Sequence, residues 1–542
     1  MEFDFIIIGA GSAGCVLANR LSAVPGHRVA LVEAGGRDRS PWIHVPVGYF
    51  KTMGNPSTDW CFETEFDPGL NGRSIPWPRG KVLGGSSSIN GLLYVRGQPQ
   101  DYDYWRQLGN PGWSWEDVLP HFQRAESWQG AASGNGMNLR GTDGPLIVSP
   151  MRLRRQIVDL WIEAAVNAGY RRNPDYNAEN QEGVGHFQQT EFRGRRCSSA
   201  VAYLRPAEKR KNLTVFTGTT AVRLCMADGR MTGLRIRRDR SGEETELKAD
   251  REVVLSAGSI GSPQILMLSG IGDGAELGRH GIAVRKELPG VGRNLQDHLQ
   301  ARPVFCTSLP TINIEINNWL KQAAIAVRYL LTRTGPMTMA ASLGTGFLKT
   351  RSELDSPDIQ FHIQPFSADS PGQGTHGFSA FTASVLQLRP ESTGRIRLRS
   401  ADPGDPPEIH PNYLATPTDC RTLVDGIRIA RRIARHEPLA SHVTAEHSPG
   451  PDVADDDDNA ILDWARSTAT TIYHPTGTCR MGPESDPGAV VDERLRIRGI
   501  SGLRVADASI MPTIVSGNTN APAIMIGEKA AEMILEDART GP

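Results

Sequence analysis

The sequence predicts an α/β fold, α+β overall, with more than one domain, and three observations support this. The first 33 residues alternate strand, glycine-rich turn, helix and strand, which is the order of a parallel sheet. Residues 358–364, 381–388 and 395–399 have the composition of further strands, which suit an antiparallel sheet. At 542 residues, the chain is longer than one hydrophobic core usually supports.

The N-terminal strand, Phe3–Ile8, leads into Gly9-Ala10-Gly11-Ser12-Ala13-Gly14, a G-x-G-x-x-G turn. Such glycines permit a tight turn and close approach of the backbone to a pyrophosphate. The following helix directs its first N–H groups at the phosphates. A second strand ends at Glu33, where a carboxylate can accept hydrogen bonds from ribose hydroxyls. The combination predicts a Rossmann-like dinucleotide-binding domain; a tight turn in an ordinary α/β domain is the alternative.

Two irregular segments follow. Gly35–Pro78 has little periodicity, and an irregular stretch of this length inside a compact domain is usually functional or wraps a ligand. Trp60 in it either lies near the dinucleotide or is a buried structural residue. Pro78–Gly97 contains adjacent glycines and three serines, whose N–H and hydroxyl groups offer a second contact to a pyrophosphate.

The candidate catalytic residues are His474, in Thr471–Gly482, and Asn518, in Gly517–Pro522. Histidine suits a general acid or base because its pKa lies near the operating pH. A neutral asparagine can position a hydroxyl group without competing for its proton. The alternative for His474 is a buried structural histidine.

The chain ends with an apolar strand that reaches Asp507 and a helix over 523–535, which we expect to pack on the first domain. The two ends of the chain must then meet in space.

Charge and cysteine content exclude several classes of protein. Lysine and arginine number 59 against 60 acidic residues, which gives no reason to expect nucleic acid as a partner. The seven cysteines form no C-x-x-C, so neither a disulfide framework nor a metal site is predicted. No signal peptide or spanning segment is evident, and we expect a cytoplasmic protein. The amphipathic helix Ile316–Leu331 packs on a sheet or docks peripherally on a membrane surface.

Three longer segments make the assignment specific: Pro78–Gly97, Ser256–Gly272 and Gly292–His298, the last with the pattern G-x-N-L-x-D-H. They resemble the first signature, the second signature and an interior motif of the glucose–methanol–choline (GMC) oxidoreductases, flavoenzymes that oxidise alcohols with FAD. The matches run in family order from residue 3 to about 535, so the resemblance covers the whole chain.

The resemblance implies a Rossmann-like FAD-binding domain over 1–150, 200–300 and 466–542. A discontinuous substrate-binding domain, an antiparallel sheet with helices, then covers 151–199 and 301–465. In the family, a residue placed like Val222 contacts the adenine end through its backbone. The expected FAD contacts are Gly9, Gly11, Ser12, Ala13, Gly14, Glu33, Ala34, Trp60, Arg79, Val82, Gly84, Asn90, Gly91, Leu92, Leu93, Val222, Ala257, Tyr473, Asp507, Ala508 and Thr519.

The implied reaction is oxidation of a primary alcohol to the aldehyde. A hydride moves to flavin N5, His474 takes the hydroxyl proton, and Asn518 orients the hydroxyl group. Some relatives attach FAD through a histidine where this chain has Ile89, so non-covalent FAD is expected. His298 is expected to be a packing residue. Electrons then pass to a quinone, another carrier or O₂.

Other activities of this fold remain alternatives. A hydroxynitrile lyase retains FAD without using it for redox chemistry. A light-driven fatty-acid decarboxylase and a non-catalytic FAD-binding protein are disfavoured by the presence of both His474 and Asn518. The sequence does not select among choline, aliphatic, aromatic, polyol and polyether alcohols, nor does it predict the oligomeric state.

Overall fold

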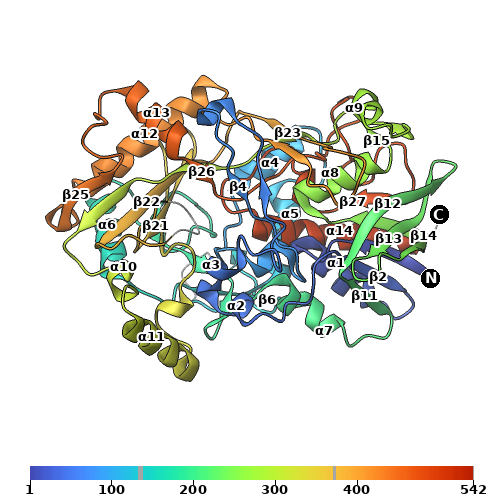
Figure 1. Ribbon diagram of the computed structural model, residues 1–542, viewed down its shortest axis with the longest axis horizontal. Helices are drawn as coiled ribbons and strands as arrows, with labels where there is room; N and C mark the ends of the chain where they lie inside the picture. Colours follow the sequence, from blue (N-terminus) through green and yellow to red (C-terminus); the bar gives the residue numbers. More distant parts are fainter. Residues whose placement is uncertain (132–137, 370–373, 541–542) are drawn as a thin grey trace.

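Two large β-sheets organise the computed structural model, which describes residues 1–131, 138–369 and 374–540 (Figure 1). The first sheet has the strand order β11-β2-β1-β14-β13-β12, with β27 paired to β14. Its strands are β1 (Glu2–Ile8), β2 (Val29–Glu33), β11 (Leu213–Thr217), β12 (Thr219–Ala227), β13 (Arg230–Arg238), β14 (Glu244–Leu255) and β27 (Leu503–Val505).

The parallel part of this sheet is the predicted dinucleotide-binding core. β11, β2, β1, β14 and β27 run parallel, whereas β12 and β13 form an antiparallel hairpin extension. β2 is buried throughout, as expected for a parallel strand covered on both faces. Helix α1 (Ser12–Ser22) packs on β1 and β2 and against the C-terminal helix α14 (Asn520–Thr540).

The two ends of the chain meet, as predicted. The Arg20 guanidinium of α1 pairs with the buried Glu528 carboxylate of α14 at 2.7 Å. The Ser12 hydroxyl donates a hydrogen bond to the Asn520 side-chain oxygen at 2.8 Å. Both contacts span 508 residues of sequence, so the start of the fold is completed only by its end.

The second sheet is antiparallel, with the order β25-β19-β22-β21-β20-β7; β18 pairs with β22 and with β26. Its strands are β7 (Gly183–His186), β18 (Leu299–Ala301), β19 (Val304–Thr307), β20 (Gly344–Leu348), β21 (Ile359–Gln364), β22 (Ala380–Gln387), β25 (Val443–Ser448) and β26 (Thr470–Thr471). Helices α6 (Gln156–Asn167) and α12 (Pro417–Ala434) pack on it. Strands from both predicted segments of the second domain therefore share one sheet.

The faces of β21 differ in polarity because side chains alternate along a strand. Phe361 contacts Trp161 of α6, and Ile359 lies beside Gly426 of α12, so the odd-numbered side chains face the helices. His362 and Gln364 line a cavity on the opposite face. The polar face of this sheet is thus turned toward the interior of the molecule.

Residues 395–399 do not join the second sheet, and that prediction is wrong. They lie largely in β23 (Gly394–Arg397), which pairs with β17 (Arg293–Leu295) and β24 (Glu408–His410) in a separate three-stranded sheet. β22 ends at Gln387, and Pro390, three residues later, cannot continue a hydrogen-bonded ladder. The chain has therefore left the large sheet before it reaches β23.

The predicted amphipathic helix exists as α11 (Trp319–Thr332), but it does not pack on a sheet. Among its side chains only Tyr329 is buried. Trp319 is 73% exposed and Leu331 is 79% exposed. The helix projects from the body of the molecule at the lower left of Figure 1. Within the described residues, no helix is long and apolar enough to cross a membrane.

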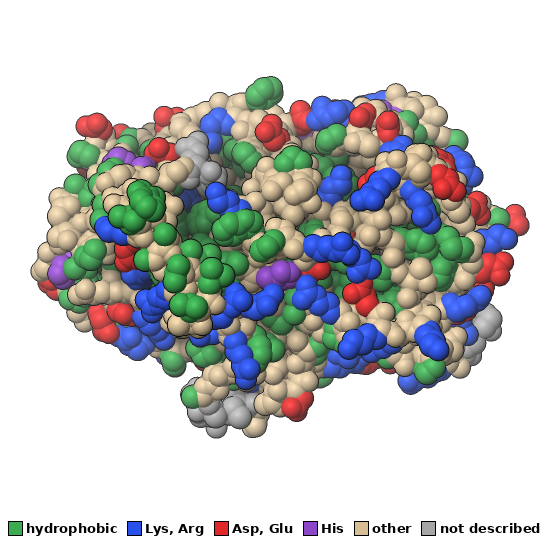
Figure 2. Space-filling model, turned by 60° about the horizontal axis from the view of Figure 1, so that its bottom comes forward, with side chains coloured by type: hydrophobic (Ala, Val, Ile, Leu, Met, Phe, Trp, Pro, Cys, Tyr) green, Lys and Arg blue, Asp and Glu red, His purple; other side chains and the backbone are tan. Residues whose placement is uncertain are grey.

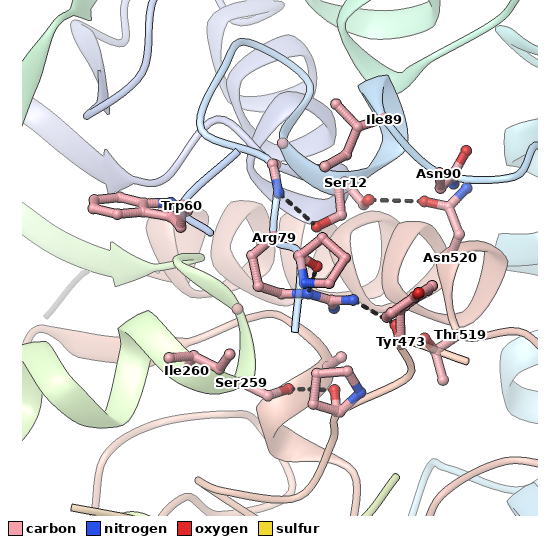
Figure 3. A pocket seen from close by; sticks show the side chains of 18 of the residues that line it. Ser12, Trp60, Arg79, Ile89, Asn90, Ser259, Ile260, Tyr473, Thr519 and Asn520 are labelled. Carbon is pink, nitrogen blue, oxygen red and sulfur yellow. Dashed lines mark hydrogen bonds between the residues drawn. The ribbon is translucent and has the colours of Figure 1, made fainter. Parts of the chain in front are cut away.

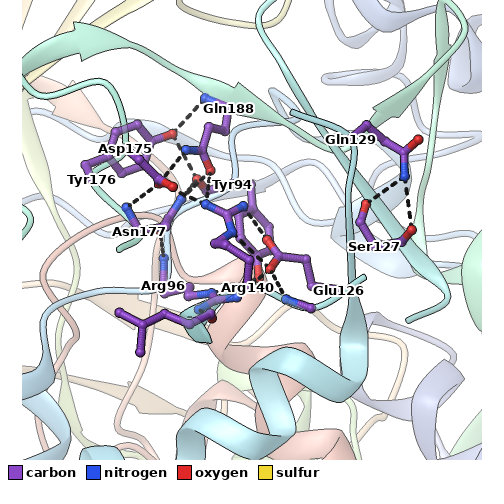
Figure 4. Close-up of polar contacts among 12 residues, drawn as sticks. Tyr94, Arg96, Glu126, Ser127, Gln129, Arg140, Asp175, Tyr176, Asn177 and Gln188 are labelled. Carbon is purple, nitrogen blue, oxygen red and sulfur yellow. Dashed lines mark hydrogen bonds and ion pairs between the residues drawn. The ribbon is translucent and has the colours of Figure 1, made fainter. Parts of the chain in front are cut away.

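A buried ion network holds the segment that follows the second glycine-rich turn (Figure 4). Glu126 is fully buried and accepts from Arg96 at 2.5 Å and from Arg140. Arg140 also donates to Asp175 at 2.9 Å. The Arg96 backbone N–H donates to Asn177 at 2.8 Å. These contacts fix the chain just after Asn90, Gly91 and Leu93, which line the cavity described next.

Candidate active site

A long cavity lies between the two sheets, with an empty volume of about 2420 Å³ that includes its mouth. Its lining comes from segments near both ends of the chain and from the second sheet. The predicted site residues that line it are Gly9, Gly11, Ser12, Ala13, Glu33, Ala34, Trp60, Arg79, Asn90, Gly91, Leu93, Ala257, Tyr473, His474, Asp507, Ala508, Asn518 and Thr519. Most of the predicted site residues therefore share one cavity.

Five predicted residues lie outside the lining: Gly14, Val82, Gly84, Leu92 and Val222. Gly14 packs against the glycine-rich turn. A Cβ atom at this position would lie 1.9 Å from the Gly9 carbonyl oxygen, so no larger residue fits there. Val82 packs with Ile89 in a small apolar cluster. Val222 directly follows residues 219–221, which do line the cavity.

One end of the cavity has the features of a dinucleotide site. The Glu33 carboxylate accepts from the backbone N–H groups of Ala10 and Gly35, each at 2.8 Å. Burial raises its pKa to about 7. No side chain caps the N-terminus of α1, which leaves its first N–H groups for a ligand. A Cβ atom at Gly11 would meet no protein atom closer than 3.9 Å, so the backbone there is open to the cavity.

The central part of the cavity joins distant segments (Figure 3). Arg79 donates to the Tyr473 carbonyl oxygen at 2.6 Å, and the Ser259 hydroxyl donates to the Pro475 carbonyl oxygen at 2.7 Å. The Asp507 carboxylate accepts from Gly258 N–H at 2.9 Å. The bonds from Arg79 and Ser259 hold the loop that contains His474 in place.

His474 and Asn518 lie together, as predicted. The Asn518 Nδ2 and His474 Nε2 atoms are 3.0 Å apart, and both residues line the cavity. On the other side of the ring, His474 Nδ1 lies 3.0 Å from Nδ1 of His298. His298 Nε2 lies 2.9 Å from the Leu388 carbonyl oxygen. The three side chains and the carbonyl form a continuous chain of hydrogen bonds.

The carbonyl at the end of this chain fixes the proton positions. A carbonyl oxygen only accepts, so Nε2 of His298 must carry its proton. Burial lowers the pKa of His298 to about 4, which keeps the ring neutral and its Nδ1 an acceptor. His474 therefore donates from Nδ1 and presents an unprotonated Nε2 to the cavity. Asn518 donates to that nitrogen, and its buried Oδ1 has no partner among the described residues.

The electrostatic surroundings also keep His474 neutral. Its pKa lies well below 6.5, chiefly because the ring is buried and then because of the nearby His298 and His362. Its backbone N–H donates to the Asp297 carboxylate at 2.7 Å, which fixes the position of the loop. A neutral, oriented imidazole facing a cavity can accept a proton from a bound hydroxyl group.

His298 has a larger part in the site than the expected packing role, because it sets the tautomer of the His474 ring. Sequence reasoning placed it in an interior motif and missed this contact. The position of His298 beside Asp297 was the one indication of such a role in the sequence. The residue that His298 contacts, His474, lies 176 residues away in the chain. Gln300, Arg302, His362 and Gln364 also line the cavity and were not singled out from the sequence.

Comparison with known proteins agrees with this arrangement. Residues 3–300 and 390–527 match the N-terminal and C-terminal parts of the GMC oxidoreductase family. An "Alcohol dehydrogenase [acceptor]" of Pseudomonas putida is 42% identical over 98% of this chain and 96% of its own length. An "Oxygen-dependent choline dehydrogenase" of Photobacterium profundum is 41% identical over 100% of this chain and 94% of its own.

Solved structures show the same fold. The pyridoxine 4-oxidase named as from "Mesorbium loti" superimposes with a TM-score of 0.88 at 31% identity, covering 99% of both chains. The strand order, the glycine-rich turn, the paired ends and the His474–Asn518 pair are thus accompanied by full-length similarity in sequence and structure. The chain belongs to the GMC oxidoreductase family.

Proposed function

We propose that this protein uses FAD to oxidise a primary alcohol to the aldehyde, with His474 as the general base and Asn518 orienting the hydroxyl group. The observation that carries the proposal is the unprotonated Nε2 of His474, held 3.0 Å from Asn518 at the cavity wall. The named relatives act on an alcohol and on choline, which is itself an alcohol. They support CH–OH oxidation here.

The residues of the cavity fit FAD. Glu33 stands where ribose hydroxyls would reach it, the open backbone at Gly11 suits a pyrophosphate, and the uncapped start of α1 would stabilise its charge. When bound, FAD supplies the hydride acceptor. Ile89 lines the cavity and has no atom able to bond covalently to a flavin. We therefore propose that FAD is held non-covalently, so denaturation and filtration would release all of the flavin.

The chain's own residues arrange the proton transfer. On binding, the alcohol oxygen would accept from Asn518 Nδ2, and the alcohol proton would replace the Asn518 hydrogen bond at the lone pair of His474 Nε2. The Nδ1–H of His474 stays bonded to His298, which prevents the ring from rotating. Such positioning of reacting groups accounts for several kcal/mol of barrier reduction. The electrons leave in a second half-reaction to a quinone, another carrier or O₂.

The proposal is tested by an anaerobic titration of the FAD-loaded protein with a panel of alcohols. Loss of the oxidised flavin absorbance is expected with at least one alcohol, together with one equivalent of aldehyde. Readmitting air then distinguishes O₂ from a quinone as acceptor. A flavin that stays oxidised with every alcohol, while cyanide is released from a cyanohydrin, would instead support the lyase. The three proteins compared above are named as oxidising enzymes, so none of them favours that alternative.

A further inference from the structure

We call the part of the cavity lined by Gln300, Arg302, His362 and Gln364 the substrate half. It contains an arginine that has no acidic partner among the described residues. Arg302 lines the cavity, and no carboxylate of the described residues forms an ion pair with it. Its Nη2 atom lies 3.4 Å from the Gln364 side-chain oxygen, and its buried Nε has no hydrogen-bond partner there. Burial lowers the pKa of Arg302, but guanidinium remains charged at neutral pH. A charge in such a place is usually paired.

The strand register places Arg302 on the same wall as the catalytic residues. His298, Gln300 and Arg302 alternate along one strand and its extension, so they share a face. His298 contacts His474, and Arg302 lies roughly 13 Å further along. Ala301 pairs with Val385 of β22, and Val304 pairs with Thr382 of the same strand, so Arg302 lies opposite Ser384. Ser384 in turn pairs with His362 of the next strand, β21.

This wall also contains several unsatisfied polar atoms. In the described structure, the side-chain oxygen of Gln300, Nε2 of His362 and the hydroxyl of Ser384 are buried without partners. Buried polar atoms are nearly always hydrogen-bonded, so a polar ligand or water must meet them. Among the described residues, the only carboxylates in the cavity lining are Glu33 and Asp507, and backbone N–H groups already occupy both. The substrate half is therefore positively charged.

We propose that the substrate is an alcohol that also carries an anionic group, a carboxylate, and that Arg302 binds this group while the CH–OH end lies at His474. The inference rests on the proposed function and names its substrate class. Guanidinium matches carboxylate geometry through paired hydrogen bonds. A quaternary ammonium alcohol such as choline would meet an unpaired positive charge here, with no free carboxylate to offset it.

The test compares ω-hydroxyalkanoates of increasing chain length with their own carboxamides, which have the same shape without the charge. Anaerobic flavin reduction should favour the carboxylate by about 10–100-fold in the ratio of rate to dissociation constant. Arg302→Gln should abolish that preference, Arg302→Lys should restore part of it, and Arg240→Gln, on an exposed loop, should leave it unchanged. Equal rates for carboxylate and amide in the unaltered protein would overturn the proposal.

A binding measurement separates this proposal from the proposed function. Saturated carboxylates that cannot be oxidised should perturb the flavin spectrum of the native protein, and Arg302→Gln should weaken that binding about 10–100-fold. This result is expected even if no alcohol is oxidised. Loss of FAD from Arg302→Gln with unchanged carboxylate binding would show that Arg302 serves the cofactor, and would overturn the assignment.

An independent observation concerns helix α11, whose apolar stripe faces outward. Leu320, Val327, Leu330 and Leu331 recur at helical spacing, and each is more than half exposed. Such a stripe normally faces a core. Trp319 stands exposed at the start of the same helix. The helix is held from beneath by Tyr329, whose hydroxyl donates to the Gly194 carbonyl oxygen at 2.8 Å.

The charges around α11 identify what covers it. Trp319–Thr332 contains Lys321 and Arg328 and no acidic residue, and Arg333 follows at its end. Arg193 and Arg195 flank the Gly194 contact. Figure 2, which brings this lower edge forward, shows hydrophobic side chains bordered by lysine and arginine. We propose that α11 inserts its apolar stripe into an anionic membrane surface, with the basic residues at the headgroups.

Vesicle sedimentation of the FAD-loaded protein tests this. Phosphatidylglycerol vesicles should retain the protein, phosphatidylcholine vesicles should retain less, and Leu331→Glu with Leu330→Glu should abolish retention. Phe66→Glu is the matched control, because Phe66 is 78% exposed and lies outside α11. Unchanged retention of the double variant would contradict the proposal. The proposal would also be contradicted if the native protein were a dimer and the double variant were a monomer, because α11 would then bind a second copy of the chain.

Discussion

His474 differs from an ordinary buried histidine because both of its ring nitrogens have defined partners, Asn518 on one side and His298 on the other, each at 3.0 Å. Replacing it by alanine should leave FAD bound and slow anaerobic flavin reduction by about 10²–10⁴-fold, the usual scale for losing a general base. Stopped-flow absorbance measures the rate. His447→Ala, at an exposed position, is the control. A His474→Ala protein that is reduced at the normal rate would exclude the histidine as base.

The pH dependence of flavin reduction follows from the lowered pKa of His474. Its base form exists above its own pKa, which burial holds well below 6.5. The rate constant should therefore stay level as pH falls from alkaline values through 6.5, and decline only at more acidic pH, when Nε2 becomes protonated. Stopped-flow measurements across pH with one alcohol give the profile. A half-maximal rate at or above pH 6.5 would contradict this assignment.

At the residue scale, the candidate residues could be predicted from residue type and nearby motifs, and contacts that depend on distant pairing could not. His474 and Asn518 were chosen because alcohol oxidation would require such side chains, and the two lie in contact. The role of His298 depends on a contact across 176 residues. Among the described residues Arg302 contacts Gln364 but no carboxylate, and sequence patterns do not encode the lack of an acidic neighbour in space.

The elements around the site depend on buried polar contacts as much as on hydrophobic packing. Glu126 is fully buried between Arg96 and Arg140. Glu126→Gln should lower the free energy of unfolding by about 3–5 kcal/mol, because it leaves buried arginine charge uncompensated. Denaturant unfolding measures the change. As a control, Glu163→Gln removes an ion pair with Arg172 that is half exposed, and it should change the free energy of unfolding by less than about 1 kcal/mol. Comparable losses in both variants would show that the buried network contributes no more than an exposed ion pair.

Element types were easier to predict than element partners. The strands that begin the first sheet and the helix α14 follow from local periodicity and composition. The same periodicity marked α11 as amphipathic but could not say whether its apolar stripe faces protein or solvent. Nor could it show that β23 pairs with β17 instead of the large sheet, since partner choice depends on where the chain turns after Pro390.

For the whole molecule, completion of the first domain depends on the contact between α1 and α14, which joins the two ends of the chain. Glu528 is fully buried and pairs with Arg20, and it also accepts from the Tyr203 hydroxyl at 2.9 Å. Glu528→Gln should destabilise the protein by about 1–3 kcal/mol and speed FAD loss, because α1 begins at the pyrophosphate turn. Calorimetry and flavin fluorescence measure both. Glu532→Gln, half exposed one turn later on the same helix, is the control and should change neither.

The pairing of the two chain ends also has a consequence during synthesis. Ser12 and Arg20 are made more than 500 residues before Asn520 and Glu528. Until then the glycine-rich turn lacks the helix that packs against it, and the loop of His474 and Asn518 does not yet exist. A nascent or prematurely terminated chain thus has no complete cofactor site. Flavin retention would then distinguish finished molecules from fragments, and the fragments would remain open to chaperones and proteases.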